Sequence, residues 1–118
     1  MSVVLLIDDE PGMGSLVHMC LAGLGAKVVQ VETLEQAIAA AREERVGAVL
    51  LDIALEGEDG LDLMPGLREE RSLTAAPVIA FSVHDSREPE ALQKGAAAFV
   101  RKPFKSEDLR DAVREHLA

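Results

Sequence analysis

The sequence predicts a doubly wound α/β domain built on a five-stranded parallel sheet. Short, continuously apolar runs alternate with segments in which apolar residues recur at helical spacing. Strands that are apolar on both faces are typical of parallel sheets covered by helices on both sides. Asp8, Asp9 and Asp52 stand at the ends of two such runs. Open α/β sheets bind ligands at the carboxyl ends of their strands, so these acids indicate a site there.

Three strands and two helices are predicted in the first half of the chain. The strands are short apolar runs: Val3–Ile7, Lys27–Val31 and Ala48–Leu51. The first helix has Pro11 in its first turn and Gly25 as its C-terminal cap. Its apolar face has i, i+3, i+4 spacing and comprises Met13, Leu16, Val17, Cys20, Leu21 and Leu24. Thr33 and Gln36 form a capping box, which predicts a second helix running to about Arg45.

A loop, LEGEDG, and a third helix over Leu61–Glu70 follow the third strand. Pro65 and Gly66 lie inside this helix and predict a late start or a distorted first turn. The fourth and fifth strands are again short apolar runs: Pro77–Phe81 and Ala97–Val100. Strict alternation of these strands with helices predicts a parallel sheet flanked by five helices.

The fourth helix should be unusually short. Gly95 stands only thirteen positions after Ser82. The helix expected around Pro89–Lys94 therefore has room for roughly one and a half turns before Gly95 ends it. Ser106 is the predicted cap of the last helix, with acidic residues in its first turn.

Length and composition favour one domain spanning residues 1–118. The formal net charge of −9 argues against direct binding to nucleic acid or to an anionic membrane surface. Cys20 is the only cysteine, so no internal disulfide forms, and its place on an apolar helix face favours an inert core thiol. No apolar run approaches the length of a membrane span. We expect a cytoplasmic protein.

The site residues indicate phosphoryl chemistry. Three carboxylates in one crevice repel one another, and a hard divalent cation such as Mg²⁺ relieves that repulsion. Ser82 and Lys102 follow the fourth and fifth apolar runs, so they should lie at the same edge of the sheet. Lys102 supplies a second positive charge for a phosphoryl group, and Ser82 supplies a hydroxyl donor. A carboxylate can attack phosphorus and form an aspartyl phosphate.

The whole chain resembles the CheY-like receiver domain of two-component response regulators. The resemblance implies a flavodoxin-like architecture with the strands in the order 2-1-3-4-5. The resemblance rests on LLIDDEP, on LLDI followed by EDG, on Ser82 after the fourth strand, and on GAAAFVRKPF. Each motif alone is weak, whereas all of them in this order are highly specific.

The resemblance implies a metal site. Asp9 and Asp52 would bind Mg²⁺ directly, the backbone carbonyl of Ala54 would be a third ligand, and Asp8 would act through water or as a lesser ligand. Asp52 would be the phosphoacceptor.

The resemblance also assigns the surrounding groups. Lys102 would pair with the phosphoryl group, and Lys102–Pro103 would be a cis peptide. Ser82 would be the switch hydroxyl and Phe99 the switch aromatic, although burial in the core is the simpler interpretation of Phe99. The donor would be a sensor histidine kinase or phosphotransfer protein, and the target an effector domain or another protein. The domain would be a phosphoacceptor with at most weak self-catalysed turnover, and a monomer until phosphorylation allows a dimer.

Three positions depart from the usual receiver pattern. Glu56 stands four positions after Asp52, where receivers usually carry Pro. Ala54 and His84 flank the path of a hydrolytic water in family members, so they bear on the lifetime of the phosphoryl group.

Three alternatives stay open. A receiver-like module could signal without phosphorylation, but the complete acidic pocket argues against this. A small aspartyl-phosphate phosphatase or phosphotransferase usually places a second acid two residues after its nucleophile, where this chain has Ala54. A flavin or nucleotide module is disfavoured because the chain has no GxGxxG or Walker motif.

Overall fold

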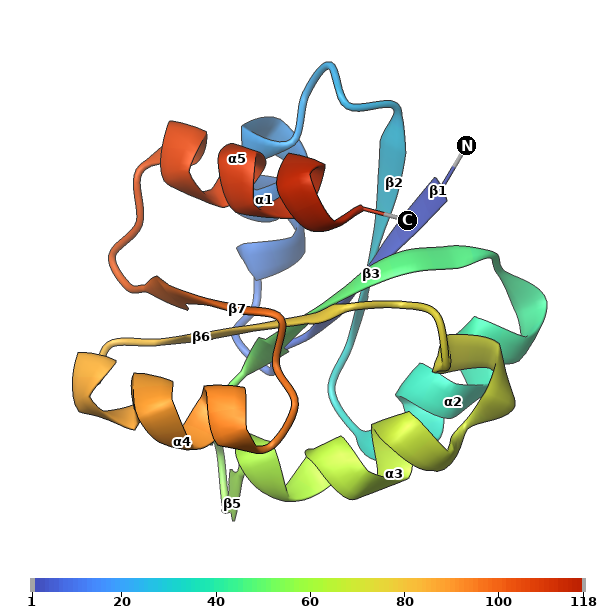
Figure 1. Cartoon of the computed structure of the whole chain (residues 1–118). Coiled ribbons are helices and arrows are strands. Elements are labelled where there is room, and N and C mark those ends of the chain that lie inside the picture. The colour runs from blue at the N-terminus through green and yellow to red at the C-terminus, as the bar shows by residue number, and fades with distance from the viewer. Residues whose placement is uncertain (1, 118) are drawn as a thin grey trace.

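The computed structural model describes residues 2–117 and confirms the predicted sheet. Its five parallel strands are β1 (Ser2–Ile7), β2 (Ala26–Val31), β3 (Val46–Asp52), β6 (Val78–Ser82) and β7 (Ala98–Arg101). Their order is β2-β1-β3-β6-β7, which is the predicted 2-1-3-4-5 arrangement (Figure 1).

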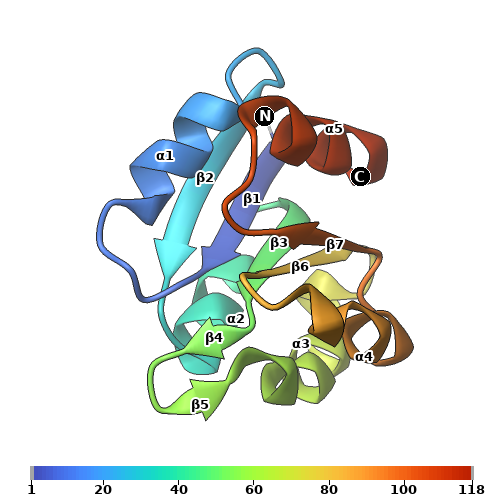
Figure 2. The ribbon, with the colours of Figure 1, turned by 90° about the vertical axis from the view of Figure 1, so that its left-hand side faces the viewer.

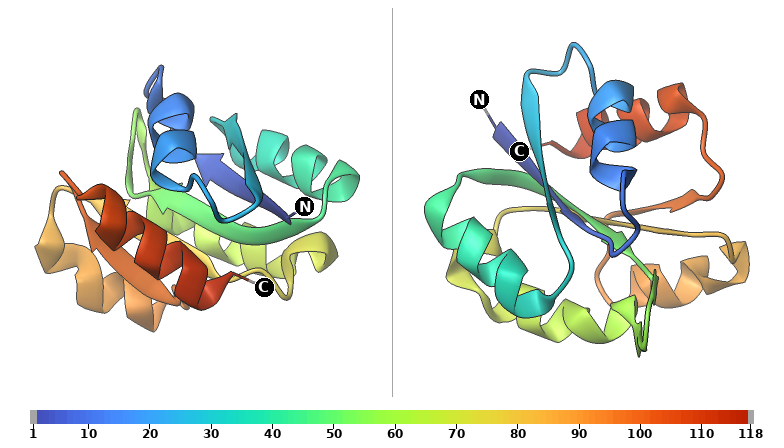
Figure 3. Two further views of the ribbon diagram at one scale, coloured as in Figure 1. Left: turned by 90° about the horizontal axis from the view of Figure 1, so that it is seen from above. Right: turned by 180° about the vertical axis from the view of Figure 1, so that it is seen from behind.

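Helices cover both faces of the sheet. They are α1 (Met13–Cys20), α2 (Leu34–Glu43), α3 (Met64–Glu69), α4 (Glu88–Gln93) and α5 (Ser106–His116). Figure 3 shows α1 and α5 on one face and α2, α3 and α4 on the other. None of the helices within residues 2–117 is both long enough and apolar enough to cross a membrane.

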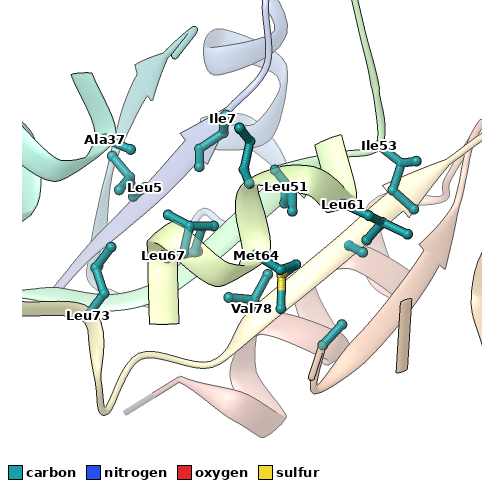
Figure 4. Packing of buried hydrophobic residues seen from close by; sticks show 14 of the residues in the cluster. Leu5, Ile7, Ala37, Leu51, Ile53, Leu61, Met64, Leu67, Leu73 and Val78 are labelled. Carbon is teal, nitrogen blue, oxygen red and sulfur yellow. The ribbon is translucent and has the colours of Figure 1, made fainter. Parts of the chain in front are cut away.

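The hydrophobic core consists of two clusters, one on each face of the sheet. Alternate strand residues divide between them: Leu5 and Leu51 belong to the cluster under α2 and α3, whereas Leu6 and Leu50 belong to the cluster under α1 and α5. Figure 4 shows the first cluster, with Met64 and Leu67 of α3 above the sheet. Every residue of β3 is buried, which explains why this strand reads as a continuous apolar run.

The first helix is shorter than predicted. It begins at Met13 because Gly12 has a left-handed conformation with φ of 85°, which leaves Pro11 outside the helix in a turn. The helix ends at Cys20 and not near Gly25. Leu16 lies on the predicted apolar face, yet it is 46% exposed, because the sector that contacts the sheet is centred on Met13, Val17 and Cys20.

The segment LEGEDG is predicted to be a loop, but the structure differs and contains secondary structure there. It forms a small antiparallel hairpin, β4 (Ala54–Leu55) and β5 (Glu58–Asp59), beyond the carboxyl end of β3 (Figure 2). The predicted distortion of the third helix is confirmed, because a 3-10 turn over Gly60–Leu63 precedes α3.

The short fourth helix is also confirmed. Six residues form α4, preceded by a 3-10 turn over Asp85–Arg87. The prediction that Ser106 caps α5 was wrong: Lys105 occupies the cap position, and the Ser106 hydroxyl instead accepts a hydrogen bond from the Cys20 thiol at 3.5 Å. Thr33 does cap α2 and accepts a hydrogen bond from the backbone N–H of Gln36.

Candidate functional site

Strand register places the predicted site residues at one edge of the sheet. Ile7 of β1 pairs with Leu51 of β3. The next residues, Asp8 directly after β1 and Asp52 at the end of β3, therefore lie side by side. Ser82, the last residue of β6, pairs with Arg101 of β7, and Lys102 follows directly. The β4–β5 hairpin lies beside this edge (Figure 2).

The three acids converge as predicted. One carboxylate oxygen from each of Asp8, Asp9 and Asp52 lies within 4.8 Å of the others. Asp8 is 0% exposed and Asp52 is 5% exposed. Each carboxylate also accepts one backbone N–H: Asp8 from Glu10 at 2.8 Å, Asp52 from Ala54 at 3.0 Å and Asp9 from Glu56 at 2.6 Å. These bonds fix the orientation of every carboxylate.

Lys102 is the cation of this pocket. Its Nζ lies 3.5 Å from Asp8 Oδ2 and 3.4 Å from Asp52 Oδ2. It also lies 4.5 Å from the centre of the Phe81 ring, a cation–π distance that holds the ammonium over the pocket. One ammonium facing three carboxylates leaves the pocket with an excess of negative charge.

Asp8 bears most of the cost of that excess. Burial raises the pKa of the Asp8 carboxyl and the charge of Asp52 adds to the rise, while the Glu10 N–H and Lys102 oppose it. The buried Oδ2 of Asp8 makes no hydrogen bond within residues 2–117. A buried carboxylate oxygen without a hydrogen-bond donor is costly, and the Lys102 ammonium at 3.5 Å offsets only part of this cost, since the pKa of Asp8 remains raised.

These residues fit a hard divalent cation. The pocket offers carboxylate oxygens from the buried Asp8 and Asp52 and from the half-buried Asp9, and the buried Asp8 Oδ2 has no hydrogen-bond donor within residues 2–117. Oxygen donors in this number suit Mg²⁺, which keeps several waters and takes only one or two carboxylates. The acidic triad could therefore hold a metal ion.

Ser82 and Phe99 line the neighbouring strands. Ser82 is 1% exposed, and its Oγ accepts a hydrogen bond from the backbone N–H of His84 at 3.0 Å. Phe99 of β7 is half-buried, pairs with Ala80 of β6 and packs against the core under α2 and α3. The peptide between Lys102 and Pro103 is cis, as the resemblance implies.

Sequence reasoning missed an ion-pair link beside the pocket. Arg87 stands just before α4, and its Nη2 lies 2.8 Å from Oδ2 of Asp59 in the hairpin and 2.9 Å from Oε1 of Glu90. Partial burial opposes ionisation of Asp59, but the hydrogen bonds from Arg87 and from the Leu61 N–H outweigh it and lower the pKa of this carboxyl. The link joins the loop after Asp52 to the loop after Ser82. No sequence pattern pairs these residues, because they are far apart in the chain.

Gly60 belongs to the EDG motif, and its structural role does not follow from the sequence. It is buried against β3, and its N–H donates to the Ile53 carbonyl at 2.7 Å. A Cβ at this position would meet the carbonyl oxygen of Asp52 and would lie 2.8 Å from Ile53 Cα. Only glycine allows the chain to pass this close to the backbone of Asp52.

Comparison with known proteins decides the family. The family model described as the response regulator receiver domain matches residues 4–114. The chain belongs to this family. It is a receiver domain, a phosphoacceptor of two-component signalling rather than an enzyme in the usual sense.

Similar proteins carry this domain in different settings. The chain is 36% identical over 124 residues to the transcriptional regulatory protein KdpE of Mycobacterium tuberculosis, covering 100% of this chain and 54% of that protein. It is 31% identical over 115 residues to the sensor protein GacS of Pseudomonas syringae, covering 93% of this chain and 13% of that protein. The chain thus spans about half the length of KdpE, at 54%, and much less of GacS, at 13%.

Solved structures agree with the fold. The receiver domain of NtrX from Brucella abortus is 30% identical, covers 97% of each chain and gives a TM-score of 0.84. The chemotaxis protein CheY4 of Vibrio cholerae, at 22% identity, covers 99% of each chain with a TM-score of 0.86, and this likeness concerns the fold alone.

Proposed function

We propose that this receiver accepts its phosphoryl group on Asp52, with Mg²⁺ held by Asp9, Asp52 and the backbone carbonyl of Ala54, and with Asp8 acting through water. The observation that carries the proposal is the convergence of three carboxylates within 4.8 Å, with Lys102 Nζ 3.4 Å from Asp52 Oδ2. Bound Mg²⁺ would neutralise charge on the phosphoryl oxygens.

The residues divide the remaining work of the transfer. An Asp52 oxygen forms the new bond to phosphorus, while the bond from phosphorus to the donor breaks and its electron pair leaves with the donor. The N–H of Ala54 holds Asp52 in one orientation. Lys102, already facing Asp52, pairs with the arriving phosphoryl oxygens. The donor is a histidine kinase or phosphotransfer protein in the cytoplasm.

Phosphorylation by a small donor tests this proposal. Incubated with acetyl phosphate and Mg²⁺, the wild-type protein should gain one phosphoryl group by intact-mass measurement. The adduct should be absent from Asp52→Asn and strongly reduced in EDTA. An adduct of equal size in Asp52→Asn, or one that forms equally well without divalent metal, would exclude the assignment.

Mg²⁺ should stabilise the fold, because binding relieves repulsion among Asp8, Asp9 and Asp52. At a hundredfold excess over Kd the gain in the free energy of unfolding is about 2.7 kcal/mol. Asp9→Ala should lose this gain, whereas Asp62→Ala, an exposed acid outside the triad, should keep it. The melting temperatures of both variants with and without Mg²⁺ measure this difference. If Mg²⁺ raises the melting temperature of Asp9→Ala as much as that of the wild type, the ligands are misassigned.

We further propose that Ser82 and Phe99 form the switch. A phosphoryl group beside Ser82 draws its hydroxyl inward, away from the His84 N–H that it now binds, and vacates space for the Phe99 ring. Backbone amide shifts on phosphorylation should extend along β6 and β7 to Phe99. Shifts limited to residues around Asp52 would contradict a switch of this kind.

The signal would pass to an effector domain or another protein, without direct contact to nucleic acid or membrane. The domain would be a monomer when unphosphorylated, and phosphorylation is the step that would allow a dimer. A second function as a phosphatase finds no support at the site, since the position where such enzymes place a second acid is the exposed Ala54.

A further inference from the structure

Gln30 lies behind the acidic pocket on β2 and was not singled out by any sequence pattern. It pairs in register with Leu6 of β1, two residues before Asp8. Its side-chain amide reaches across the end of β1. Nε2 donates to the carbonyl of Asp8 at 2.7 Å and to the carbonyl of Glu10 at 2.9 Å. Oε1 accepts from the backbone N–H of Gly14 at 2.8 Å.

This hydrogen-bond pattern fixes the orientation of the amide. Both N–H groups of Nε2 face carbonyl oxygens, and Oε1 faces an N–H. A flipped amide would place an oxygen against two carbonyls and an NH₂ group against a donor, so all three bonds would be lost. The Gln30 side chain is therefore held at three points in one conformation.

The same amide compensates for a missing helix cap. Gly12 is the N-cap of α1 and has no side chain to accept the free N–H groups of the first turn. Gln30 accepts one of them, that of Gly14, from the neighbouring strand. One side chain thus joins the start of α1 to the loop that carries the acids.

We propose that Gln30 is a positioning residue for the metal-binding carboxylates. It holds the carbonyls on both sides of Asp9, and the Glu10 N–H in the same loop orients the Asp8 carboxylate at 2.8 Å. Fixing this backbone holds Asp8 and Asp9 near Asp52 before any cation binds, against their mutual repulsion. Groups that orient metal ligands commonly change metal affinity by 10- to 100-fold when removed. The inference rests on the proposed Mg²⁺ site.

Gln30→Met tests the proposal, because Met has a similar length and makes none of the three hydrogen bonds. We expect Mg²⁺ affinity, measured by calorimetry or amide-shift titration, to fall by roughly tenfold. In the metal-free protein, hydrogen exchange of the Gly14 amide should accelerate. Phosphorylation by acetyl phosphate should slow at limiting Mg²⁺ and recover at saturating Mg²⁺. Gln36→Met is the matched control, because it removes a hydrogen bond to the Glu32 N–H and leaves the pocket loop intact.

Gly14→Ala is a second route to the same perturbation. A Cβ at Gly14 would lie 2.8 Å from Gln30 Oε1 and 3.3 Å from Gln30 Cβ, so it displaces the amide without removing it. Alanine favours a helix, so this variant should fold. As a single substitution, Gly14→Ala should weaken Mg²⁺ binding. Combined with Gln30→Met, it should cause little further loss of Mg²⁺ affinity.

Two results would overturn the inference. If Gln30→Met lowers the melting temperature but changes Mg²⁺ affinity by less than twofold, Gln30 is only a structural tether. If wild-type protein binds no Mg²⁺, the metal site itself is wrong and the positioning role falls with it. Wild-type controls in each titration keep the two failures apart.

Discussion

Gly60→Ala should destabilise the domain severely and displace Asp52. The added Cβ would collide with the carbonyl oxygen of Asp52 and lie 2.8 Å from Ile53 Cα. Both are backbone atoms, one in the last residue of β3 and one in the residue that follows it. β3 is the central and fully buried strand, which cannot shift without breaking its pairing with β1 and β6. Overpacking of this kind costs about 3 kcal/mol or more where the surroundings cannot yield.

Urea unfolding measures this cost, and Gly66→Ala provides the control. A Cβ at Gly66 would also be close to another atom, 2.5 Å from Leu34 Cδ2, but that atom ends a flexible side chain. Gly66 lies in α3, where Ala is favoured by roughly 0.5–1 kcal/mol, so its net cost should be small. Equal stabilities of the two variants would show that the contact at Gly60 is not rigid.

Lys102→Met should slow phosphorylation of Asp52 by at least about a hundredfold, the usual effect of removing one charge-stabilising donor. Lys102 is the cation that faces Asp8 and Asp52. Its loss should also raise the pKa of Asp8 further, because Lys102 opposes the rise caused by burial. The metal-free protein should lose stability at neutral pH, while Mg²⁺ should still bind and restore part of it.

The rate of adduct formation from acetyl phosphate at saturating Mg²⁺ is the measurement. Lys94→Met is the matched control, because Lys94 forms an exposed ion pair with Glu90 of α4 and does not belong to the acidic pocket. Exposed pairs of this kind contribute little. A Lys102→Met rate close to that of Lys94→Met would remove Lys102 from the phosphoryl site.

The convergence of the site residues could be predicted from sequence because the acids stand at the end of a buried strand or directly after one. Continuous apolar runs predict where the strands lie in the sequence. The parallel register of these strands then brings Asp8, Asp52, Ser82 and Lys102 to one edge of the sheet. The ends of the helices were harder to predict from the sequence. The first helix starts late because Gly12 adopts a left-handed conformation, and the Ser106 hydroxyl turns to Cys20 instead of capping α5.

What the sequence could not reveal depends on contacts between distant residues. Gln30 sits in an edge strand among Val residues and carries no motif, yet its amide joins three backbone groups of another segment. The hairpin after Asp52 is formed by two-residue strands that are too short for a periodic pattern. Arg87 and Asp59 meet only because two loops converge.

The central claim is that the phosphoryl group resides on Asp52, and mapping the modified residue tests it most directly. Protein phosphorylated in the presence of Mg²⁺ is treated with borohydride, which reduces an aspartyl phosphate to homoserine, and is then digested and sequenced by mass spectrometry. We expect homoserine at position 52, with Asp8 and Asp9 unchanged. Homoserine at Asp8 or Asp9 with Asp52 intact, or a phosphoryl group on Ser82 or His84, would contradict it.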